Sequence, residues 1–317
     1  MSSILRLAVV AIGGNSLITD KAHLSIPDQY AAAATTCGQI VDMIEAGWNV
    51  LLTHGNGPQV GFIMRRSELS IHELPPVPMD YAGADIQGAL GYMFSRALRN
   101  EFRRRGIARQ PVAIVTQTLV DKDDPAFGNP IKPIGSYFTE AQAHKHRVDQ
   151  GWHIHEDAGR GWRRVVPSPL PQRVIELEQI RFLLRAGYLV IACGGGGIPV
   201  IENDQGDLVG VEAVIDKDLA SSLLARQLGA QLLMISTAVE KIALDFNTPQ
   251  QRWVDHLNLA QAKELFSQNQ FDPGSMGPKI RAIIEFLEAG GERSVITNPQ
   301  NIGRALSGQT GTHIARA

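Results

Sequence analysis

The sequence has little cysteine and few aromatic residues, and it lacks any hydrophobic run long enough to cross a bilayer. Cysteine occurs twice in 317 residues, and aromatic residues make up 6% of the chain. Cys37 and Cys193 stand far apart in apolar segments, which predicts buried free thiols in a reducing compartment. A bilayer-spanning helix needs about 20 apolar residues, and Arg6 interrupts the apolar start of the chain. We therefore expect a cytoplasmic protein without a membrane partner.

The chain also lacks a strong charge of either sign. It has 30 Lys and Arg residues against 32 Asp and Glu residues, for a net charge of −2. This balance excludes a generally basic nucleic-acid binder, so we expect no nucleic-acid partner. Apolar residues make up 44% of the chain, enough for a sizeable core in one large or two moderate domains.

Glycine is abundant, and its clusters follow predicted strands. The clusters are Gly13-Gly14 after the apolar run 5–12, Gly55-Asn56-Gly57 after 49–53, and Gly194–Gly197 after 188–193. Without a Cβ atom, consecutive backbone N–H groups can converge on phosphate or carboxylate oxygens. Ligands of parallel sheets bind beyond the carboxyl ends of the strands. Three such turns in one chain therefore predict an anion site, with phosphate chemistry favoured.

Predicted strands alternate with predicted helices along most of the chain. Strands are expected at 5–12, 49–53, 112–118, 188–193, 232–235 and 294–297. Helices are expected at 27–46, before Gly106, at 174–186, after Asp216 and at 278–289, and a hairpin at 200–211. The alternation predicts an α/β fold, a three-layer αβα sandwich with a mostly parallel central sheet.

Residues 121–166 interrupt this rhythm. The segment is polar, and we interpret it as an inserted subdomain rather than a layer of sheet. It contains four of the nine histidines, which are His144, His146, His153 and His155. Each H-x-H pair would share one face of a strand but not of a helix. No cysteine or carboxylate spacing completes a known zinc pattern, so we favour a solvated basic face and expect no metal site.

The common phosphate-binding and hydrolytic motifs are absent. There is no G-x-x-x-x-G-K-[ST] loop, and no G-x-G-x-x-G follows a strand with an acidic residue about 20 positions later. The Gly194–Gly197 run leads into the predicted hairpin rather than a helix, which argues against a Rossmann dinucleotide site. Serine-hydrolase, Cys–His and H-E-x-x-H signatures are also missing.

Two lysines stand at predicted helix starts and are candidates for phosphoryl transfer. Lys217 lies between Asp216 and Asp218, and Lys279 follows Pro278, which suits the first helical position. Phosphoryl transfer needs fixed positive charge and hydrogen-bond donors around the moving group. The alternatives remain open at this point: the aspartates could simply cap a helix, and Lys279 could be a surface residue.

Longer stretches of the sequence resemble the carbamate kinases of the amino-acid kinase superfamily, in order and over nearly the whole length. The matching stretches are Ala11–Asn15, Thr53–Gly61, Gln87–Tyr92, Asn129–Gly135, Glu156–Pro169, Cys193–Val200, Gly210–Asp218 and Pro273–Lys279. The resemblance implies reversible phosphoryl transfer from ATP to carbamate, giving ADP and carbamoyl phosphate without a covalent intermediate. It also implies a homodimer and Mg²⁺ bound through ATP.

The resemblance further implies a single domain, 1–317, in which residues 121–166 form a lid. The N-terminal half would hold carbamate, and the C-terminal half, from about 190 to 317, the nucleotide. Implied catalytic residues are Lys217 and Lys279 on the phosphoryl group, Lys132 from the lid, and Asp218 orienting the lysines. Implied carbamoyl-binding residues are Gly13, Gly14, Asn15, Gly55, Asn56 and Gly57. Implied nucleotide-binding residues are Gly194, Gly195, Gly196, Asp216, Thr237, Ser275, Met276 and Gly277.

The sequence departs from related patterns at two places. Many amino-acid kinases have a lysine beside the first Gly-Gly, where this chain has Ala11 and Ile12; the carbamate kinases also lack it. Ala238 replaces an acidic residue that usually follows the threonine, which affects the expected nucleotide loop. Another acyl kinase of the superfamily, or a catalytically silent regulatory homologue, are the alternative functions. The three lysines argue against the silent homologue.

The dimer prediction has an additional basis in the long helix before Gly106. Its apolar residues cover a broad arc, wider than one sheet face would need. These residues are Ile86, Leu90, Met93, Phe94 and Leu98.

Overall fold

A sheet of eight strands runs through the computed structural model, which describes residues 6–18, 20, 22–156 and 161–316, without the side chains of Asn15 and Ser136. In spatial order the strands are β15 (His256–Asn258), β17 (Thr312–Ala315), β16 (Arg293–Thr297), β12 (Leu232–Ser236), β1 (Leu7–Ile12), β2 (Asn49–His54), β9 (Leu189–Ile191) and β3 (Pro111–Ala113). Among the described strands, β16 and β17 form the one antiparallel pair in this sheet.

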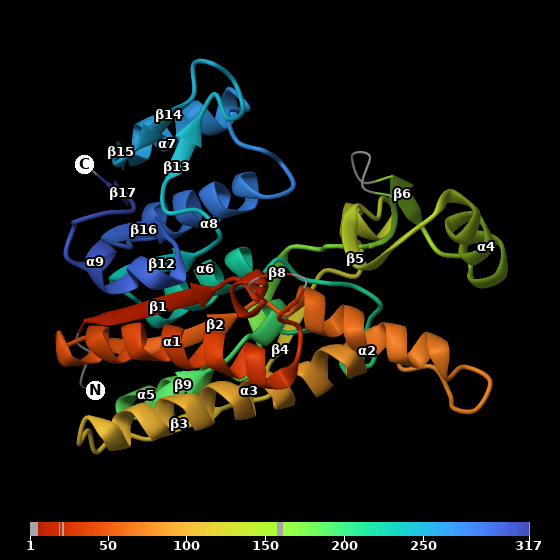
Figure 1. Ribbon diagram of the computed structural model, residues 1–317, viewed down its shortest axis with the longest axis horizontal. Coiled ribbons are helices and arrows are strands. Elements are labelled where there is room, and N and C mark those ends of the chain that lie inside the picture. Colours follow the sequence, from red (N-terminus) through yellow and green to blue (C-terminus); the bar gives the residue numbers. More distant parts are fainter. Residues whose placement is uncertain (1–5, 19, 21, 157–160, 317) are drawn as a thin grey trace.

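Helices cover both faces of this sheet (Figure 1). One face carries α1 (Ile26–Glu45), α3 (Met79–Arg104) and α9 (Ile302–Leu306), and the other carries α5 (Leu177–Arg185), α6 (Lys217–Leu228), α7 (Leu259–Ser267) and α8 (Met276–Glu288). Strand β1 is fully buried, and its alternate side chains point into two cores, one on each face of the sheet. Val10 packs toward α1 and α3, and Val9 packs toward α6 and α8. The predicted three-layer α/β sandwich is confirmed.

The single strand predicted at 112–118 is wrong. Strand β3 ends at Ala113, and β4 (Gln117–Val120) belongs to a second sheet, with the order β11 (Leu208–Gly210), β10 (Ile198–Glu202), β4 and β8 (Pro171–Val174). The side chain of Gln87 on α3 explains the break. Its Nε2 donates to the carbonyl of Thr116 at 3.0 Å, and its Oε1 accepts from the Thr116 N–H at 2.7 Å. The amide satisfies the backbone groups that a neighbouring strand would otherwise pair.

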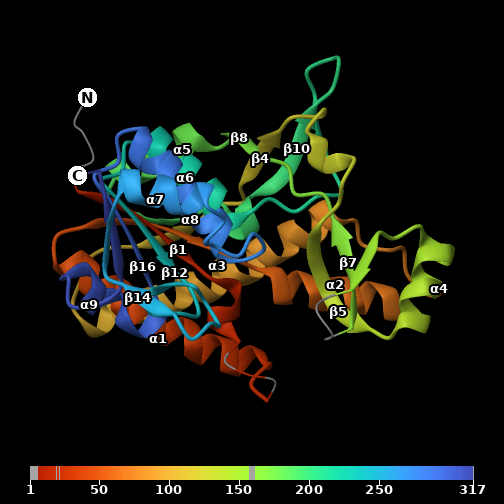
Figure 2. The same cartoon turned by 90° about the horizontal axis from the view of Figure 1, so that it is seen from above.

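The inserted segment lies outside the eight-stranded sheet, as expected for a subdomain, and it contains a small sheet that was not predicted. After the short helix η2 (Pro125–Phe127) come β5 (Lys132–Phe138), α4 (Glu140–Gln150), β6 (Ile154–Glu156) and β7 (Trp162–Val166). The three strands pair antiparallel in the order β5–β7–β6. Residues 132–156 and 161–166, called the protruding subdomain below, project from the body beside α2 (Gly57–Leu69), as both views show (Figures 1 and 2).

Several other elements differ from expectation. Helix α2 and the hairpin of β13 (Ile242–Leu244) and β14 (Arg252–Val254) were not predicted. Helix α8 begins at Met276, so Pro278 is its third residue rather than its first; the position is still allowed, because the first N–H groups of a helix have no intrahelical partner. Short helices η1 (Gly14–Leu17), η3 (Gly194–Gly196) and η4 (Pro299–Asn301) complete the described elements.

The structure tests two expectations from composition, which concern the cysteines and the absence of long apolar runs. Cys37 and Cys193 are buried and free, as predicted. Within the described ranges, no helix combines the length and apolar character that a membrane crossing requires.

The apolar arc of α3 faces the core of this same chain: Ile86 is 7% exposed and Phe94 is completely buried. The long helix therefore gives no support to a dimer through those residues.

Candidate active site

Three glycine turns meet at one edge of the central sheet. Strands β1, β2 and β9 are neighbours and parallel, so the turns that follow them lie side by side. The N–H of Gly13 donates to the carbonyl of Ser236 at 2.9 Å, and the N–H of Gly55 donates to that of Ile12 at 2.7 Å. A Cβ on Gly55 would lie 2.6 Å from the nitrogen of Gly14. Glycine is therefore required for this contact between turns.

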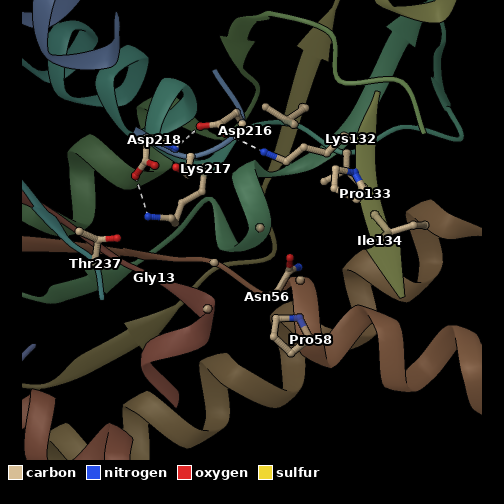
Figure 3. A pocket seen from close by; sticks show the side chains of 18 of the residues that line it. Gly13, Asn56, Pro58, Lys132, Pro133, Ile134, Asp216, Lys217, Asp218 and Thr237 are labelled. Carbon is tan, nitrogen blue, oxygen red and sulfur yellow. Dashed lines mark hydrogen bonds and ion pairs between the residues drawn. The ribbon is translucent and has the colours of Figure 1, made fainter. Parts of the chain in front are cut away.

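A cleft of about 240 Å³ opens beyond these turns (Figure 3). It lies where the order of the sheet reverses, with β2 on one side of β1 and β12 on the other, the usual ligand position in open α/β sheets. The predicted site residues that line it are Gly13, Gly14, Gly55, Asn56, Gly57, Lys132, Gly195, Asp216, Lys217, Asp218, Thr237, Ser275 and Lys279. Ser16, Pro58, Pro133, Ile134, Val214, Ile215, Ala238 and Gly274 also line it and were not predicted.

Two lysines from different helices share one carboxylate in this cleft. Nζ of Lys217, the first residue of α6, lies 2.6 Å from Oδ1 of Asp218. Nζ of Lys279, on the first turn of α8, lies 3.1 Å from Oδ2 of the same carboxylate. Lys279 also donates to the carbonyl of Ser275 at 3.1 Å. Both ammonium groups are thus held at the cleft with hydrogens left to donate.

Asp218 remains ionised because of these lysines. Its side chain is only 3% exposed, and burial alone would raise the pKa of a carboxyl group. The charges and hydrogen bonds of Lys217 and Lys279 outweigh burial and lower the pKa of Asp218 to about 2. The charged carboxylate holds the ammonium groups of both lysines in place at the cleft. The predicted orienting contacts of Asp218 are therefore present in the geometry.

Helix α6 is anchored so that Lys217 is carried on a fixed turn. Asp216 is its N-cap, accepting from the N–H of Asp218 at 2.9 Å and of Leu219 at 3.3 Å. Ser221 donates from Oγ to the carbonyl of Lys217 at 2.6 Å, and its Oγ lies 2.7 Å from that of Thr53 on β2. The side-chain bond joins α6 to the strand that precedes the second glycine turn.

Lys132 reaches the cleft from the protruding subdomain. It begins β5, and its Nζ lies 2.8 Å from Oδ2 of Asp216. Figure 3 shows Lys132 pointing from β5 toward Asp216, on the other side of the cleft from Asp218 and Lys217. Three lysines from three separate elements therefore point into one cleft. This is an arrangement suited to a polyphosphate.

Of the three glycines in Gly194–Gly196, Gly195 alone lines this cleft. Gly195, at φ +69°, lines the cleft, and a Cβ there would overlap the side-chain amide of Asn56. Gly194 instead packs against the ring of His54, and Gly196 against the backbone of Ile215. Gly194 and Gly196 are outside the lining of the cleft, and they allow close packing beneath it.

A second, wider cleft of about 690 Å³ adjoins the first and shares Pro133, Gly274 and Ser275 with it. It contains Met276, which was predicted, and also apolar and aromatic residues that were not. Of these, Val239, Ala243, Phe246 and Trp253 lie in or beside the β13–β14 hairpin, and Phe271 lies between α7 and α8. Phe246 and Trp253 are 57% and 55% exposed. The sequence indicated a nucleotide loop around Ala238, but it did not indicate this second cleft. Gly277 lines neither cleft, and its N–H donates to the carbonyl of Asp272 at 2.7 Å.

The histidines of the insert do not converge. His144 and His146 lie on α4, so this H-x-H pair is helical, while His155 lies on β6. His146 stacks on Trp152, with ring centroids 4.5 Å apart. Across residues 6–18, 20, 22–156 and 161–316, no group of three or more His, Cys, Asp or Glu side chains is placed to hold a metal ion.

Of the predicted site residues, Asn15 has a side chain that lies outside the described part of the structure.

Comparison with known proteins agrees with this geometry. Residues 6–298 match the amino acid kinase family. The carbamate kinase of Pyrococcus horikoshii is 46% identical over 308 residues, covering 96% of this chain and 98% of the relative. The carbamate kinase-like protein YahI of Escherichia coli is 45% identical over 313 residues, covering 98% and 99%. A structure of carbamate kinase from Giardia lamblia bound to AMP-PNP superposes with a TM-score of 0.91 at 40% identity, covering 98% of each chain.

The fold, the lysine-lined cleft and these matches define an enzyme of the kinase class, and the chain belongs to the amino acid kinase family. Within that family it is similar, over nearly its full length, to proteins named carbamate kinase.

Proposed function

We propose that this protein is a carbamate kinase, which transfers a phosphoryl group reversibly between ATP and carbamate. One observation carries the proposal. Lys217 and Lys279, from two helices, are fixed on the buried carboxylate of Asp218 beside three glycine turns. The names of relatives at 41–46% identity support carbamate as the acceptor.

The two clefts suggest where each substrate binds. The turns at Gly13-Gly14 and Gly55-Asn56 bind the small carbamoyl end, because they approach each other too closely to admit a large substituent on the substrate. The N–H groups of Gly13 and Gly55 already donate to backbone carbonyls, so those of Gly14 and Asn56 are the donors in this proposal. The adenine ring of the nucleotide lies in the wider apolar cleft near Phe246, and its phosphates extend past Ser275 toward the lysines. The predicted nucleotide roles of Asp216 and Thr237 remain predictions.

The proposed mechanism is direct in-line transfer. The attacking carbamate oxygen is already anionic, so the site needs no strong general base, and none of the described cleft residues forms a His–carboxylate dyad. Lys217 and Lys279 bind the oxygens of the moving phosphoryl group, where negative charge redistributes in the transition state. Lys132 closes the site from the protruding subdomain and excludes water, which would hydrolyse carbamoyl phosphate.

Magnesium fits this site as part of the nucleotide. Both carboxylates among the described lining residues, Asp216 and Asp218, are already paired with lysines. Mg²⁺ would therefore be held by ATP oxygens and water, as it commonly is in kinases, and would neutralise part of the phosphate charge.

The assay that tests the proposal follows both directions. Purified protein with Mg²⁺-ADP and carbamoyl phosphate should produce ATP, measured by luciferase. With Mg²⁺-ATP, carbamate should release ADP, whereas N-acetylglutamate and aspartate should not exceed the rate without acceptor. Turnover with an amino-acid acceptor but not with carbamate would identify another acyl kinase. ATP binding without any turnover would identify a silent homologue.

A further inference from the structure

The two carboxylate oxygens of Asp216 are engaged by different parts of the molecule. Oδ1 caps α6 by accepting from the N–H groups of Asp218 and Leu219, at 2.9 and 3.3 Å. Oδ2 accepts from Nζ of Lys132, on β5 of the protruding subdomain, at 2.8 Å. One side chain therefore connects the subdomain directly to the turn that carries Lys217.

This ion pair is partly shielded from solvent. The side chain of Asp216 is 13% exposed and that of Lys132 is 32% exposed. Isolated ion pairs on a fully exposed surface contribute little, and shielding increases the contribution. The pair also has no need to break when a phosphate enters, because an ammonium group has three hydrogens to donate.

The segment that leads into Asp216 follows the subdomain along its length. Arg164 on β7 pairs with Glu212 at 3.4 Å. The N–H of Val214 donates to the carbonyl of Pro167 at 3.0 Å, and the side chain of Val214 packs against the cluster of Met79, Ile134 and Val166. The segment thus contacts both long strands of the subdomain before it reaches the cap of α6.

We propose that Asp216 is a positioning residue. Through its pair with Lys132 it holds the protruding subdomain over the cleft before any substrate binds, and it sets the place of Lys132 relative to Lys217 and Asp218. The kinetic part of this inference rests on the proposed function; the structural part does not.

The substitution Asp216→Asn separates the two tasks of this side chain. Asparagine is as good an N-cap as aspartate, and its Oδ1 can still accept from the two N–H groups of α6. Its Nδ2 replaces Oδ2 and cannot accept from an ammonium group. Asp204→Asn is the matched control: it breaks the exposed Lys122–Asp204 pair (3.2 Å), which joins the stretch after β4 to the β10–β11 turn, away from the cleft.

Hydrogen exchange of the ligand-free protein gives the structural test. In Asp216→Asn, amides of β5 should exchange about fivefold faster or more, the factor expected for losing one partly shielded ion pair. Amides of α6 should exchange as in the wild type, and Asp204→Asn should leave β5 unchanged. Unaltered exchange of β5 in Asp216→Asn would overturn the proposal, whatever reaction the enzyme catalyses.

Kinetics give the second test. Asp216→Asn should lower kcat/KM for carbamoyl phosphate by about 10- to 100-fold through misplacement of Lys132. Introduced into Lys132→Gln, it should lower kcat/KM no further, because the partner is already absent. Effects that multiply in the double variant would show that Asp216 acts independently of Lys132 and would overturn the proposal. Absence of turnover in the wild type would refute the proposed function and leave the exchange test intact.

Discussion

Nζ of Lys279 on α8 lies 3.1 Å from Oδ2 of Asp218 on α6, although the two residues are far apart in the chain. The packing of the two helices sets this distance. Oγ of Ser222 on α6 donates to the carbonyl of Ala282 on α8 at 2.6 Å, and both groups are buried. The position of the Lys279 ammonium group at the cleft therefore depends on a contact between α6 and α8 in the core beneath it.

Replacing either of the two lysines that pair with Asp218 should slow catalysis without unfolding the protein. We expect Lys217→Ala and Lys279→Ala each to lower kcat by about 10²–10³, the usual effect of losing one preorganised donor in the transition state. Steady-state ATP formation measures the effect. Lys263→Ala, which removes an exposed lysine paired with Glu288, is the control and should keep normal kcat. Near-normal turnover in either cleft variant would contradict the assignment.

Lys132→Ala should affect one substrate more than the other. Because Lys132 enters from the protruding subdomain, we expect kcat/KM for carbamoyl phosphate to fall strongly while the Kd for ADP, measured by calorimetry, changes little. Lys122→Ala removes a lysine of the other, exposed pair and should leave both values unaltered. Weakened ADP binding with normal carbamoyl phosphate kinetics would show that the subdomain does not serve as a lid.

His54 should make the protein less stable as the pH falls from 7 to 5. Burial, opposed by the hydrogen bond to the Gly55 carbonyl and reinforced by the charge of Lys217, lowers the pKa of His54 to about 4. The unfolded chain takes up a proton near pH 6.5 and the folded chain does not, so unfolding is favoured between those two pKa values. The loss is about 2 kcal/mol between pH 7 and pH 5.

Urea unfolding at the two pH values measures that loss. His54→Gln should reduce the pH dependence by about this amount, whereas His144→Gln, at an exposed position on α4, should not change it. An identical pH dependence in His54→Gln and the wild type would mean that another group is responsible.

Gly195→Ala should be more harmful than a glycine substitution at another positive φ. Both Gly195 (φ +69°) and Gly206 (φ +84°) have backbone conformations that disfavour alanine, at a cost of roughly 1–2 kcal/mol. A Cβ at Gly206 meets nothing within 4 Å, but at Gly195 it overlaps Asn56, adding about 1–3 kcal/mol of overpacking. We expect a lower Tm and lower kcat for Gly195→Ala, and near-normal kcat for Gly206→Ala. Equal Tm values would contradict the close approach of Asn56.

The protein should sediment at micromolar concentration as a dimer, with twice the 34.5 kDa mass of the chain. This expectation rests on the resemblance to the carbamate kinases, because the apolar arc of α3 proved to be buried in its own chain. The surface that pairs two copies must use exposed residues, such as Tyr92 on the outer side of α3. A single species of 34.5 kDa across that concentration range would refute the dimer.

The errors in the predicted fold share a cause. The strand predicted at 112–118 is a continuous β-like run in sequence, but Gln87 from α3 diverts it between two sheets. In the strands of the protruding subdomain, apolar residues are interspersed with charged, polar or glycine residues, so these strands lack the longer apolar runs by which the other strands were found. Sequence patterns report the conformation that each segment prefers locally. Where a strand ends and which sheet it joins depend on residues that are remote in sequence.

The sequence by itself determined the α/β class and the three glycine turns, and it indicated Lys217 and Lys279 at helix starts, because strand–turn–helix patterns and backbone freedom at glycine are local properties. Lys132 was expected from the family resemblance alone. The tertiary structure decided which of these residues meet. Packing of α6 against α8 brought Lys279 to Asp218, the subdomain brought Lys132 to Asp216, and the β13–β14 hairpin formed the second cleft. Distances between elements follow from how side chains fill the core, and a linear pattern does not contain them.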